Sequence, residues 1–185
     1  MDANSRAFFL LEGCCFAISV VRRFLGHADS VSCIDISSDG KTLASGSLDK
    51  TLRLWDWGTD TKEILSHSFG SQIFTVGICP GADSWAAVGL EDSNVEVINL
   101  KNSKQLYQLH LHENCVLSLK FAPNGNWFVT GGKDKLLNVW RAPFGPGVFQ
   151  TREPNSILCC DVSPNLQFIG TGSWEKMAAL YSIVY

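Results

Sequence analysis

Residues 26–56 read GHADSVSCIDISSDGKTLASGSLDKTLRLWD, and this stretch decides the fold of the 185-residue chain. It begins Gly-His, ends Trp-Asp, and places runs of β-branched and apolar residues between polar turns. Short runs of this kind favour strands that are joined by tight turns. A single small sheet cannot bury both of its faces alone, so the sequence predicts that similar units follow.

Three further strand-and-turn units follow at a regular distance. The last residues of the first strand in each unit are Ile36, Ile78, Phe121 and Val162. They lie 42, 43 and 41 residues apart, from 36 to 78, 78 to 121 and 121 to 162. A period of ~40–45 residues with these ends is typical of the WD repeat, which forms one four-stranded blade of a β-propeller. The sequence therefore predicts an all-β fold, a partial propeller of four blades, each a four-stranded antiparallel sheet.

The predicted organisation assigns residues 25–185 to the propeller segment and residues 1–24 to a divergent N-terminal leader. The repeats run at about 25–66, 67–108, 109–149 and 150–185. The strands expected in the first repeat are Val31–Ile36, Thr42–Ser47, Thr51–Asp56 and an outer strand near 62–65. Residues 18–24 are the candidate for an outer strand that closes the fold against residues 178–184, as propellers usually close.

The leader contains an apolar stretch at residues 7–21, AFFLLEGCCFAISVV. Asp2 and Glu12 do not fit the charge pattern of a secretory signal, and no clear cleavage site of small residues follows. The stretch is also shorter than the ~20 apolar residues that a membrane span needs. We therefore interpret it as a leader that ends in a strand, and we expect no membrane partner.

Composition narrows the class of function. The formal net charge is −3, so the chain has no basic excess of the kind that direct nucleic-acid binding requires. The seven cysteines are an odd number, and two pairs of them are adjacent in the sequence. Such thiols indicate a reducing compartment, the nucleus or the cytoplasm, instead of a disulfide framework.

One set of polar residues could be mistaken for a catalytic site. The set His27, Ser45, Asp49 and Trp55 recurs with the same offsets as His112, Thr130, Asp134 and Trp140. In both, Asp follows His by 22 residues and Trp follows it by 28. An enzyme seldom needs its nucleophile twice at blade period, so we interpret both sets as structural hydrogen-bond relays that tie the strands of a blade together.

The second and fourth repeats depart from this pattern. The second has Phe69, Val88, Asp92 and Ile98 at the four places, and the fourth has Glu153, Thr171, Glu175 and Tyr181. We expect these two blades to rely on apolar packing and to be locally less stable. His110, His112 and Cys115 resemble metal ligands, but alternation along a strand separates their side chains. The sequence therefore predicts no catalytic residues, no metal and no cofactor.

A candidate binding site lies at the start of the inner strands, at the mouth of the central channel. The second residues of these strands are Ser32, Phe74, Leu117 and Leu158. Each could be a core residue, but large apolar side chains at a channel mouth suit a pocket that anchors a peptide.

Longer segments carry a family resemblance. SQIFTVGICP, AVGLEDSNVEV, YQLHLHENCVLSLKFAPNGNWFVTGGKDKLLNVWR and the ending TGSWEKMAALYSIVY resemble the C-terminal WD-repeat domain of the Groucho/transducin-like enhancer of split corepressors. The resemblance covers about residues 24–185, four of the seven repeats of that domain. The family's pocket phenylalanine and the second apolar residue of its CVLSL segment match Phe74 and Leu117.

The resemblance implies a transcriptional corepressor module of the nucleus, without enzymatic activity or direct DNA binding. Its partners are then DNA-binding transcription factors with Trp-Arg-Pro-Trp or engrailed-homology-type motifs, and indirectly histone deacetylase complexes. The alternative is a generic or divergent WD-repeat scaffold in a multiprotein assembly, with peptide binding lost through truncation. Four blades leave the outward faces of the first and last blades exposed, which allows a poorly soluble fragment, a self-closed ring or self-association through the terminal blades.

Overall fold

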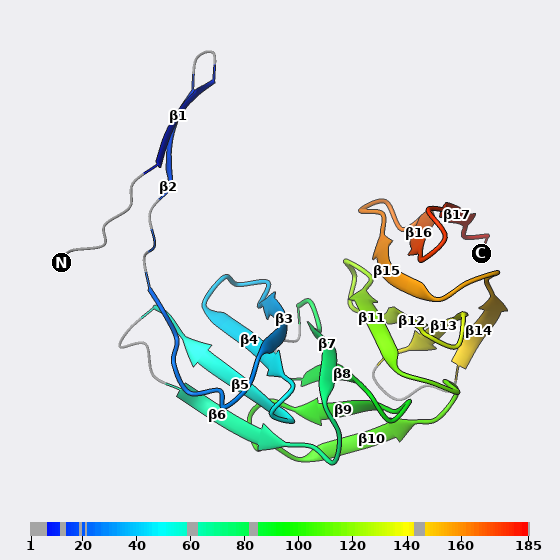
Figure 1. Cartoon of the computed structure of the whole chain (residues 1–185), viewed down its shortest axis with the longest axis horizontal. Helices are drawn as coiled ribbons and strands as arrows, with labels where there is room; N and C mark the ends of the chain where they lie inside the picture. Colours follow the sequence, from blue (N-terminus) through cyan, green and yellow to red (C-terminus); the bar gives the residue numbers. More distant parts are fainter. Residues whose placement is uncertain are drawn as a thin grey trace.

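The structure, a computed structural model, describes residues 7–11, 14–18, 20, 22–58, 63–81, 85–142 and 147–184, with residues 7–18 described in their backbone only. All of the secondary structure in this part of the chain is antiparallel strand. Four sheets stand side by side in an open arc, and the first strand of each faces its concave side (Figure 1). The predicted all-β partial propeller is confirmed.

Three blades have four strands each, in chain order from the inner to the outer edge. Blade one consists of β3 (Val31–Ile36), β4 (Thr42–Ser47), β5 (Thr51–Asp56) and β6 (Glu63–Ser68). Blade two consists of β7 (Ile73–Ile78), β8 (Trp85–Leu90), β9 (Val95–Asn99) and β10 (Gln105–Leu109). Blade three consists of β11 (Val116–Phe121), β12 (Trp127–Gly132), β13 (Leu136–Arg141) and β14 (Gly147–Arg152).

Blade four differs from the prediction, because its described residues form only three strands. These are β15 (Ile157–Val162), β16 (Phe168–Ser173) and β17 (Ala178–Ser182). The predicted outer strand at 18–24 is not formed by the described residues of that segment. Residue 18 pairs with residue 7 in a separate hairpin, and residues 20 and 22–24 carry no strand.

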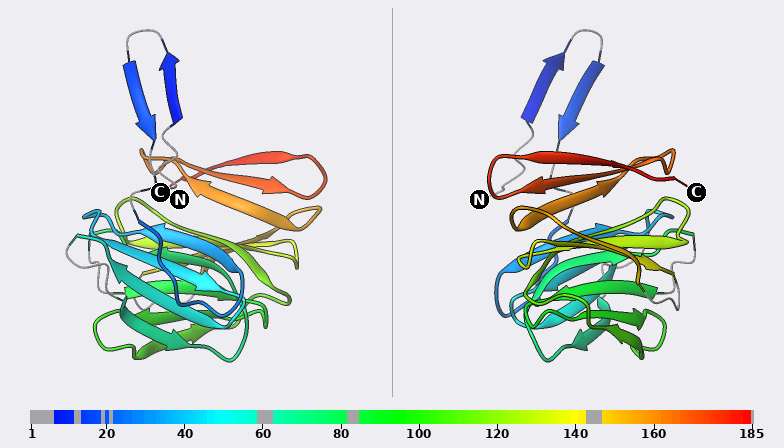
Figure 2. Two further views of the ribbon diagram at one scale, coloured as in Figure 1. Left: turned by 60° about the vertical axis from the view of Figure 1, so that its left-hand side comes forward. Right: turned by 90° about the vertical axis from the view of Figure 1, so that its right-hand side faces the viewer.

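The hairpin consists of β1 (Ala7–Leu11) and β2 (Cys14–Ile18), and it protrudes from the arc (Figures 1 and 2). Its two strands pair antiparallel with each other. Within the described residues, no helix is long and apolar enough to cross a membrane.

The hydrophobic core lies in the joints between blades. Each of its three clusters combines residues of two neighbouring blades. At the first joint, the fully buried Ile73 of β7 lies against Gly46 of β4, where an added Cβ would come within 2.5 Å of the Ile73 side chain. Val116 lies against Gly89 in the same way, and Ile157 against Gly131. A glycine in the second strand of one blade therefore leaves room for the first residue of the inner strand of the next blade.

Candidate functional site

Blade three contains the most buried polar cluster of the relay type. The side chains of His112 and Asp134 are 0% and 1% exposed. His112 Nδ1 lies 2.9 Å from Asp134 Oδ2, and His112 Nε2 lies 2.8 Å from Thr130 Oγ1. The indole of Trp140 donates to the same hydroxyl over 2.8 Å. A neutral histidine that donates from Nδ1 satisfies this chain, with indole donating to hydroxyl, hydroxyl to imidazole and imidazole to carboxylate.

Blade one brings together its four predicted residues in the same geometry. His27 Nδ1 lies 2.9 Å from Asp49 Oδ2, and His27 Nε2 lies 2.8 Å from Ser45 Oγ. Trp55 Nε1 donates to that hydroxyl over 2.8 Å. Burial acts to raise the pKa of Asp49, but hydrogen bonds from Thr51, the backbone of residue 28 and His27 outweigh it and hold the pKa well below its ordinary value.

The Asp134 carboxyl follows the same logic. Burial again acts to raise its pKa, and hydrogen bonds from His112 and the Glu113 amide lower it below the ordinary value. With the carboxylate ionised, each histidine holds one strand hydroxyl and one turn carboxylate in place. Both sets therefore act on the blade to which they belong, and both hydroxyl groups are buried, with Ser45 5% and Thr130 0% exposed.

The fourth blade contains a relay that the sequence reasoning missed. Glu153 Oε1 accepts hydrogen bonds from Thr171 Oγ1 at 2.8 Å and from the Tyr181 hydroxyl at 2.5 Å. Burial and this bond raise the pKa of Tyr181 to about 12. The offsets of 18 and 28 residues equal those of the histidine relays, so a glutamate for histidine and a tyrosine for tryptophan were a usable signal.

The expectation that the fourth blade relies on apolar packing is therefore wrong. A carboxylate accepts two hydrogen bonds there, which replaces the function of the imidazole. Blade two does follow the expectation, because Phe69, Val88 and Ile98 are buried at the relay positions.

The four candidate binding residues share a backbone feature that the sequence did not reveal. The register of each inner strand shifts between its first and third residues, so the second residue is an unpaired bulge. These second residues are Ser32, Phe74, Leu117 and Leu158. A β-bulge re-aims the side chain at the extra residue away from the regular alternation of the strand. All four blades therefore present a residue at the same end of the concave wall.

The side chains at these positions are not equivalent. Phe74 and Leu117 are half-buried, and Leu158 is exposed, so three successive inner strands carry an apolar side chain that solvent reaches. Ser32 differs, because its hydroxyl lies 2.5 Å from the carbonyl of Ile73 and 3.1 Å from that of Gly46. A serine hydroxyl has one proton to donate, and the shorter of the two contacts is to the Ile73 carbonyl. Ser32 of blade one therefore links its blade to blade two.

The other candidate ligands do not converge. His110 Nδ1 lies 2.7 Å from Asn94 Oδ1, whereas His112 belongs to the relay of blade three. Cys115 Sγ contacts Asn114 Oδ1 at 3.2 Å. Among the described residues, no group of three or more His, Cys, Asp or Glu side chains is placed to hold a metal ion.

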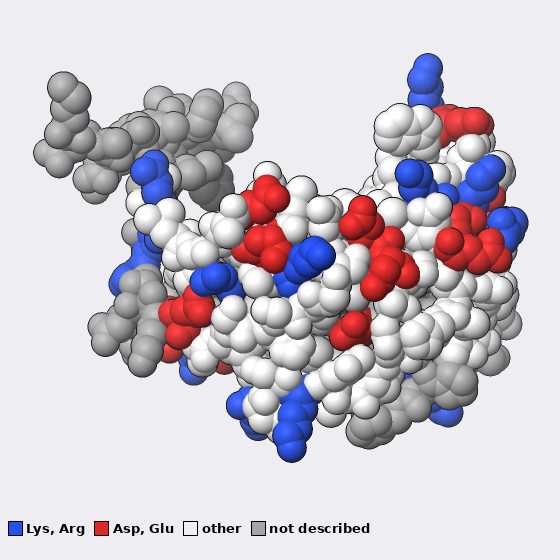
Figure 3. Space-filling view, turned by 60° about the horizontal axis from the view of Figure 1, so that its bottom comes forward, with Lys and Arg blue, Asp and Glu red and all other residues white. Residues whose placement is uncertain are grey.

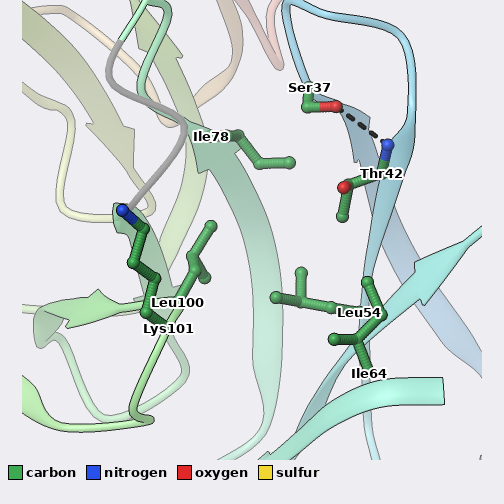
Figure 4. A pocket seen from close by; sticks show the side chains of 7 residues that line it. All are labelled: Ser37, Thr42, Leu54, Ile64, Ile78, Leu100 and Lys101. Atoms are coloured by element: carbon green, nitrogen blue, oxygen red, sulfur yellow. Dashed lines mark hydrogen bonds between the residues drawn. The ribbon is translucent and has the colours of Figure 1, made fainter.

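Two hollows lie away from the concave mouth. A cavity of about 110 Å³ lies between blades one and two, where Ser37 Oγ accepts a hydrogen bond from the Thr42 amide (Figure 4). Ile78, which ends β7, lines it, so it lies at the far end of the inner strand from Phe74. A larger groove, of about 780 Å³, lies between blades three and four. Figure 3 shows a face on which acidic and basic groups are scattered among uncharged side chains without forming a continuous basic surface.

These features define a WD-repeat propeller protein. Four sheets are stacked through joints that contain glycine, and two of the sheets contain a His–Asp–hydroxyl–Trp relay. The family described as "WD domain, G-beta repeat" matches residues 18–56 and 103–141. The chain is 51% identical to "Protein groucho" of Drosophila melanogaster over 166 residues. This aligned region covers 90% of this chain and 22% of that protein. It is 52% identical over 167 residues to "Transducin-like enhancer protein 2" of Mus musculus, with 90% and 21% covered. The chain belongs to the Groucho/transducin-like enhancer family, and it spans about a fifth of the length of these relatives.

Proposed function

We propose that this chain is a transcriptional corepressor module that binds short apolar peptide motifs at the bulged ends of its inner strands. The observation that carries the proposal is the row of solvent-accessible apolar side chains at one structural position, namely Phe74, Leu117 and Leu158. Apolar and aromatic side chains that remain accessible in a concave surface are what a peptide anchor requires.

The ligand class follows from these side chains. A half-buried phenylalanine offers a ring for edge or offset stacking with an aromatic residue, worth about 0.5–1.5 kcal/mol beyond area burial. Leu117 and Leu158 add aliphatic surface on the next two strands. Motifs of the Trp-Arg-Pro-Trp and engrailed-homology types supply aromatic groups at both ends or along one face, so they suit this row. The proposed partners are DNA-bound transcription factors that carry such motifs, with histone deacetylase complexes recruited indirectly in the nucleus.

Ser32 has a different role in this proposal. Its hydroxyl joins two blades, so it positions the rim of the site. Direct DNA binding is not part of the proposed function, because the net charge of −3 offers little attraction to phosphate.

The test is titration of a labelled Trp-Arg-Pro-Trp peptide into the purified chain, followed by fluorescence anisotropy. Phe74→Ala and Leu117→Ala should each weaken binding by ~2 kcal/mol, or ~30-fold in Kd, as at an interface hot spot. Phe149→Ala is the matched control, because Phe149 is 54% exposed on the outer strand β14. A peptide with both tryptophans replaced by alanine controls for nonspecific association. Equal affinity of both variants and the wild type would contradict the proposed site.

A second candidate function is favoured by the arc itself, since four blades enclose only part of a channel (Figure 1). In that case the chain is a scaffold of a multiprotein assembly, in which peptide binding is lost. Absence of measurable binding by the folded wild-type chain, with retained binding of larger partners, would favour this function.

A further inference from the structure

The cavity between blades one and two lies where the next joint is filled by aromatic rings. At the joint of blades two and three, Trp85 is the first residue of β8 and Phe121 is the last residue of β11. Their ring centroids lie 5.1 Å apart at an interplanar angle of 79°, and both residues are buried. The equivalent residues between blades one and two are Thr42, the first of β4, and Ile78, the last of β7. A cavity of about 110 Å³ remains there, and it is called here the joint cavity.

Blade one is the exception among the four blades at this position. The first residue of the second strand is Trp85 in blade two, Trp127 in blade three and Phe168 in blade four, whereas it is Thr42 in blade one. The register shows that these positions are equivalent, because the pairing residue of the third strand always follows 14 residues later, from 42 to 56, 85 to 99, 127 to 141 and 168 to 182. The fold therefore accommodates a ring at this position, and blade one does not supply it.

The walls of the joint cavity are aliphatic. Leu54 and Ile64 line it from blade one, and Ile78 and Leu100 line it from blade two (Figure 4). Both blades have all four strands, so both walls are present. Ile64 is 56% exposed, whereas the other three residues are buried, so Ile64 lies on the side where the cavity meets solvent. An apolar cavity of ~150 Å³ stays dry and binds a benzene ring in another protein, so the joint cavity has the chemistry for an apolar group of similar size.

The polar groups at the joint cavity define the charge that a ligand should carry. The Ser37 hydroxyl is already used, since it donates to Asp39 Oδ1 over 2.6 Å and accepts from the Thr42 amide over 2.9 Å. Lys101 lines the cavity from blade two, across from Ser37 and Thr42 (Figure 4). Lys101 is exposed, and among the described residues its ammonium makes no ion pair. A ligand carboxylate therefore fits beside Lys101, on the side of the cavity away from Asp39.

We propose that the joint cavity is a further binding site, which takes an aromatic side chain of a partner protein from a segment with acidic residues beside the ring. The ring occupies the place of the tryptophan that blade one lacks, and a neighbouring carboxylate pairs with Lys101. The site is separate from the bulged ends of the inner strands, because Ile78 is the last residue of β7 and Phe74 is its second. Lys101 repels the arginine of a Trp-Arg-Pro-Trp motif, so the two sites select different segments.

The test uses the pentapeptide Glu-Glu-Trp-Glu-Glu with 5-fluorotryptophan at its centre, observed by fluorine NMR as the purified chain is added. One anchored ring should give a Kd of ~1 mM or tighter. A peptide with lysines in place of the glutamates should bind at least ~5-fold more weakly, because like charges then meet at Lys101. Glu-Glu-Leu-Glu-Glu should compete less well than the tryptophan peptide. Equal or tighter binding of the leucine peptide overturns the aromatic occupant, and equal binding of the lysine peptide overturns the acidic context.

Two variants of blade one locate the bound ring. Thr42→Trp supplies the ring that the other blades have, so it should fill the cavity and weaken peptide binding at least ~10-fold. Ile64→Asp should have the same effect, because it puts a carboxylate at the opening, and the exposure of Ile64 leaves the fold intact if Thr42→Trp does not fold. Leu106→Asp is the matched control, since Leu106 has the same place on β10 as Ile64 on β6 and is 39% exposed. It should keep the wild-type affinity.

A lysine variant tests the acidic partner directly. Lys101→Gln should weaken binding of the glutamate peptide by ~2–5-fold, as the loss of one exposed ion pair does. Lys104→Gln is the matched control, because Lys104 is an exposed lysine of the same blade outside the cavity lining, and it should have no effect. Unaltered affinity in the folded cavity variants, or no binding to the wild-type chain at ~5 mM peptide, overturns the proposal.

Discussion

The buried relay of blade three offers a sharp test through Thr130→Val, a change that keeps the shape of the side chain and removes its hydroxyl. Thr130 and Trp140 are 0% and 1% exposed, so water cannot replace the lost partner. The hydroxyl accepts from the indole N–H of Trp140 and donates to His112 Nε2, both over 2.8 Å. The substitution therefore removes two hydrogen bonds and puts a methyl group where the hydroxyl was.

The magnitude follows from which groups lose all partners. His112 Nε2 also lies 3.0 Å from the Asn138 side-chain amide, so that nitrogen keeps a donor. The indole N–H of Trp140 has no second partner among the described contacts, and a buried orphaned donor costs about 1–3 kcal/mol. We expect Thr130→Val to lower the free energy of unfolding by ~2–3 kcal/mol, which includes a smaller contribution from the lost bond to His112.

Urea unfolding followed by tryptophan emission measures this loss, with an unchanged denaturant slope as the sign that the folded state is the same. Trp140→Phe removes the donor itself, so a double-mutant cycle isolates the pair. Thr130→Val should be less destabilising in the Trp140→Phe background, because no indole N–H is left without a partner. Thr171→Val in blade four is a graded comparison, since Tyr181 keeps its bond to Glu153 there and the loss should be smaller. Full stability of Thr130→Val, or an equal cost in both backgrounds, would refute the reasoning.

Three further outcomes are expected. The pKa of Asp134 is lowered in the folded chain, so the unfolded chain takes up this proton first as pH falls. The stabilising contribution of the ionised Asp134 carboxylate is therefore complete above pH ~4 and lost below it. Asp134→Asn should make the free energy of unfolding fall less steeply at acid pH, as measured by urea melts over a range of pH. The pKa of Tyr181 is raised to about 12, so the stability that its protonated hydroxyl contributes is complete below pH ~10 and lost as pH rises towards 12. If the free energy of unfolding falls as steeply at alkaline pH in Tyr181→Phe as in the wild type, this expectation is contradicted. Gly131→Ala should lower stability by ~1–3 kcal/mol in thermal or urea melts, because its Cβ would lie 2.4 Å from the Ile157 side chain, whereas Gly170→Ala, with nothing within 4 Å, should be tolerated.

Several features of the fold could be predicted because they are periodic and local. The spacing of Ile36, Ile78 and Phe121 placed the inner strands, and alternation with polar turns placed their hairpin partners. The offsets between His27, Asp49 and Trp55 predicted one set of contacts that the structure brings together. These inferences need only a repeat length and the chemistry of each residue type.

Other features depended on geometry that no residue type announces. The bulge at the second position of each inner strand arises from a register shift between strands, and Phe74 and Leu117 are re-aimed by it. The closing strand predicted at 18–24 is not formed by the described residues. Residue 18 pairs with residue 7 in the β1–β2 hairpin, and residues 20 and 22–24 carry no strand.

The sequence by itself determined that this protein is a stack of WD-type blades, because a 41–43-residue period and relay offsets are properties of the chain alone. Only the tertiary structure decided which faces of the inner strands are buried. Val31 and Ile73 are equivalent in sequence, yet one is 51% exposed and the other fully buried. Burial depends on whether a neighbouring blade stands opposite, and that is a relation between distant segments that local residue patterns do not specify.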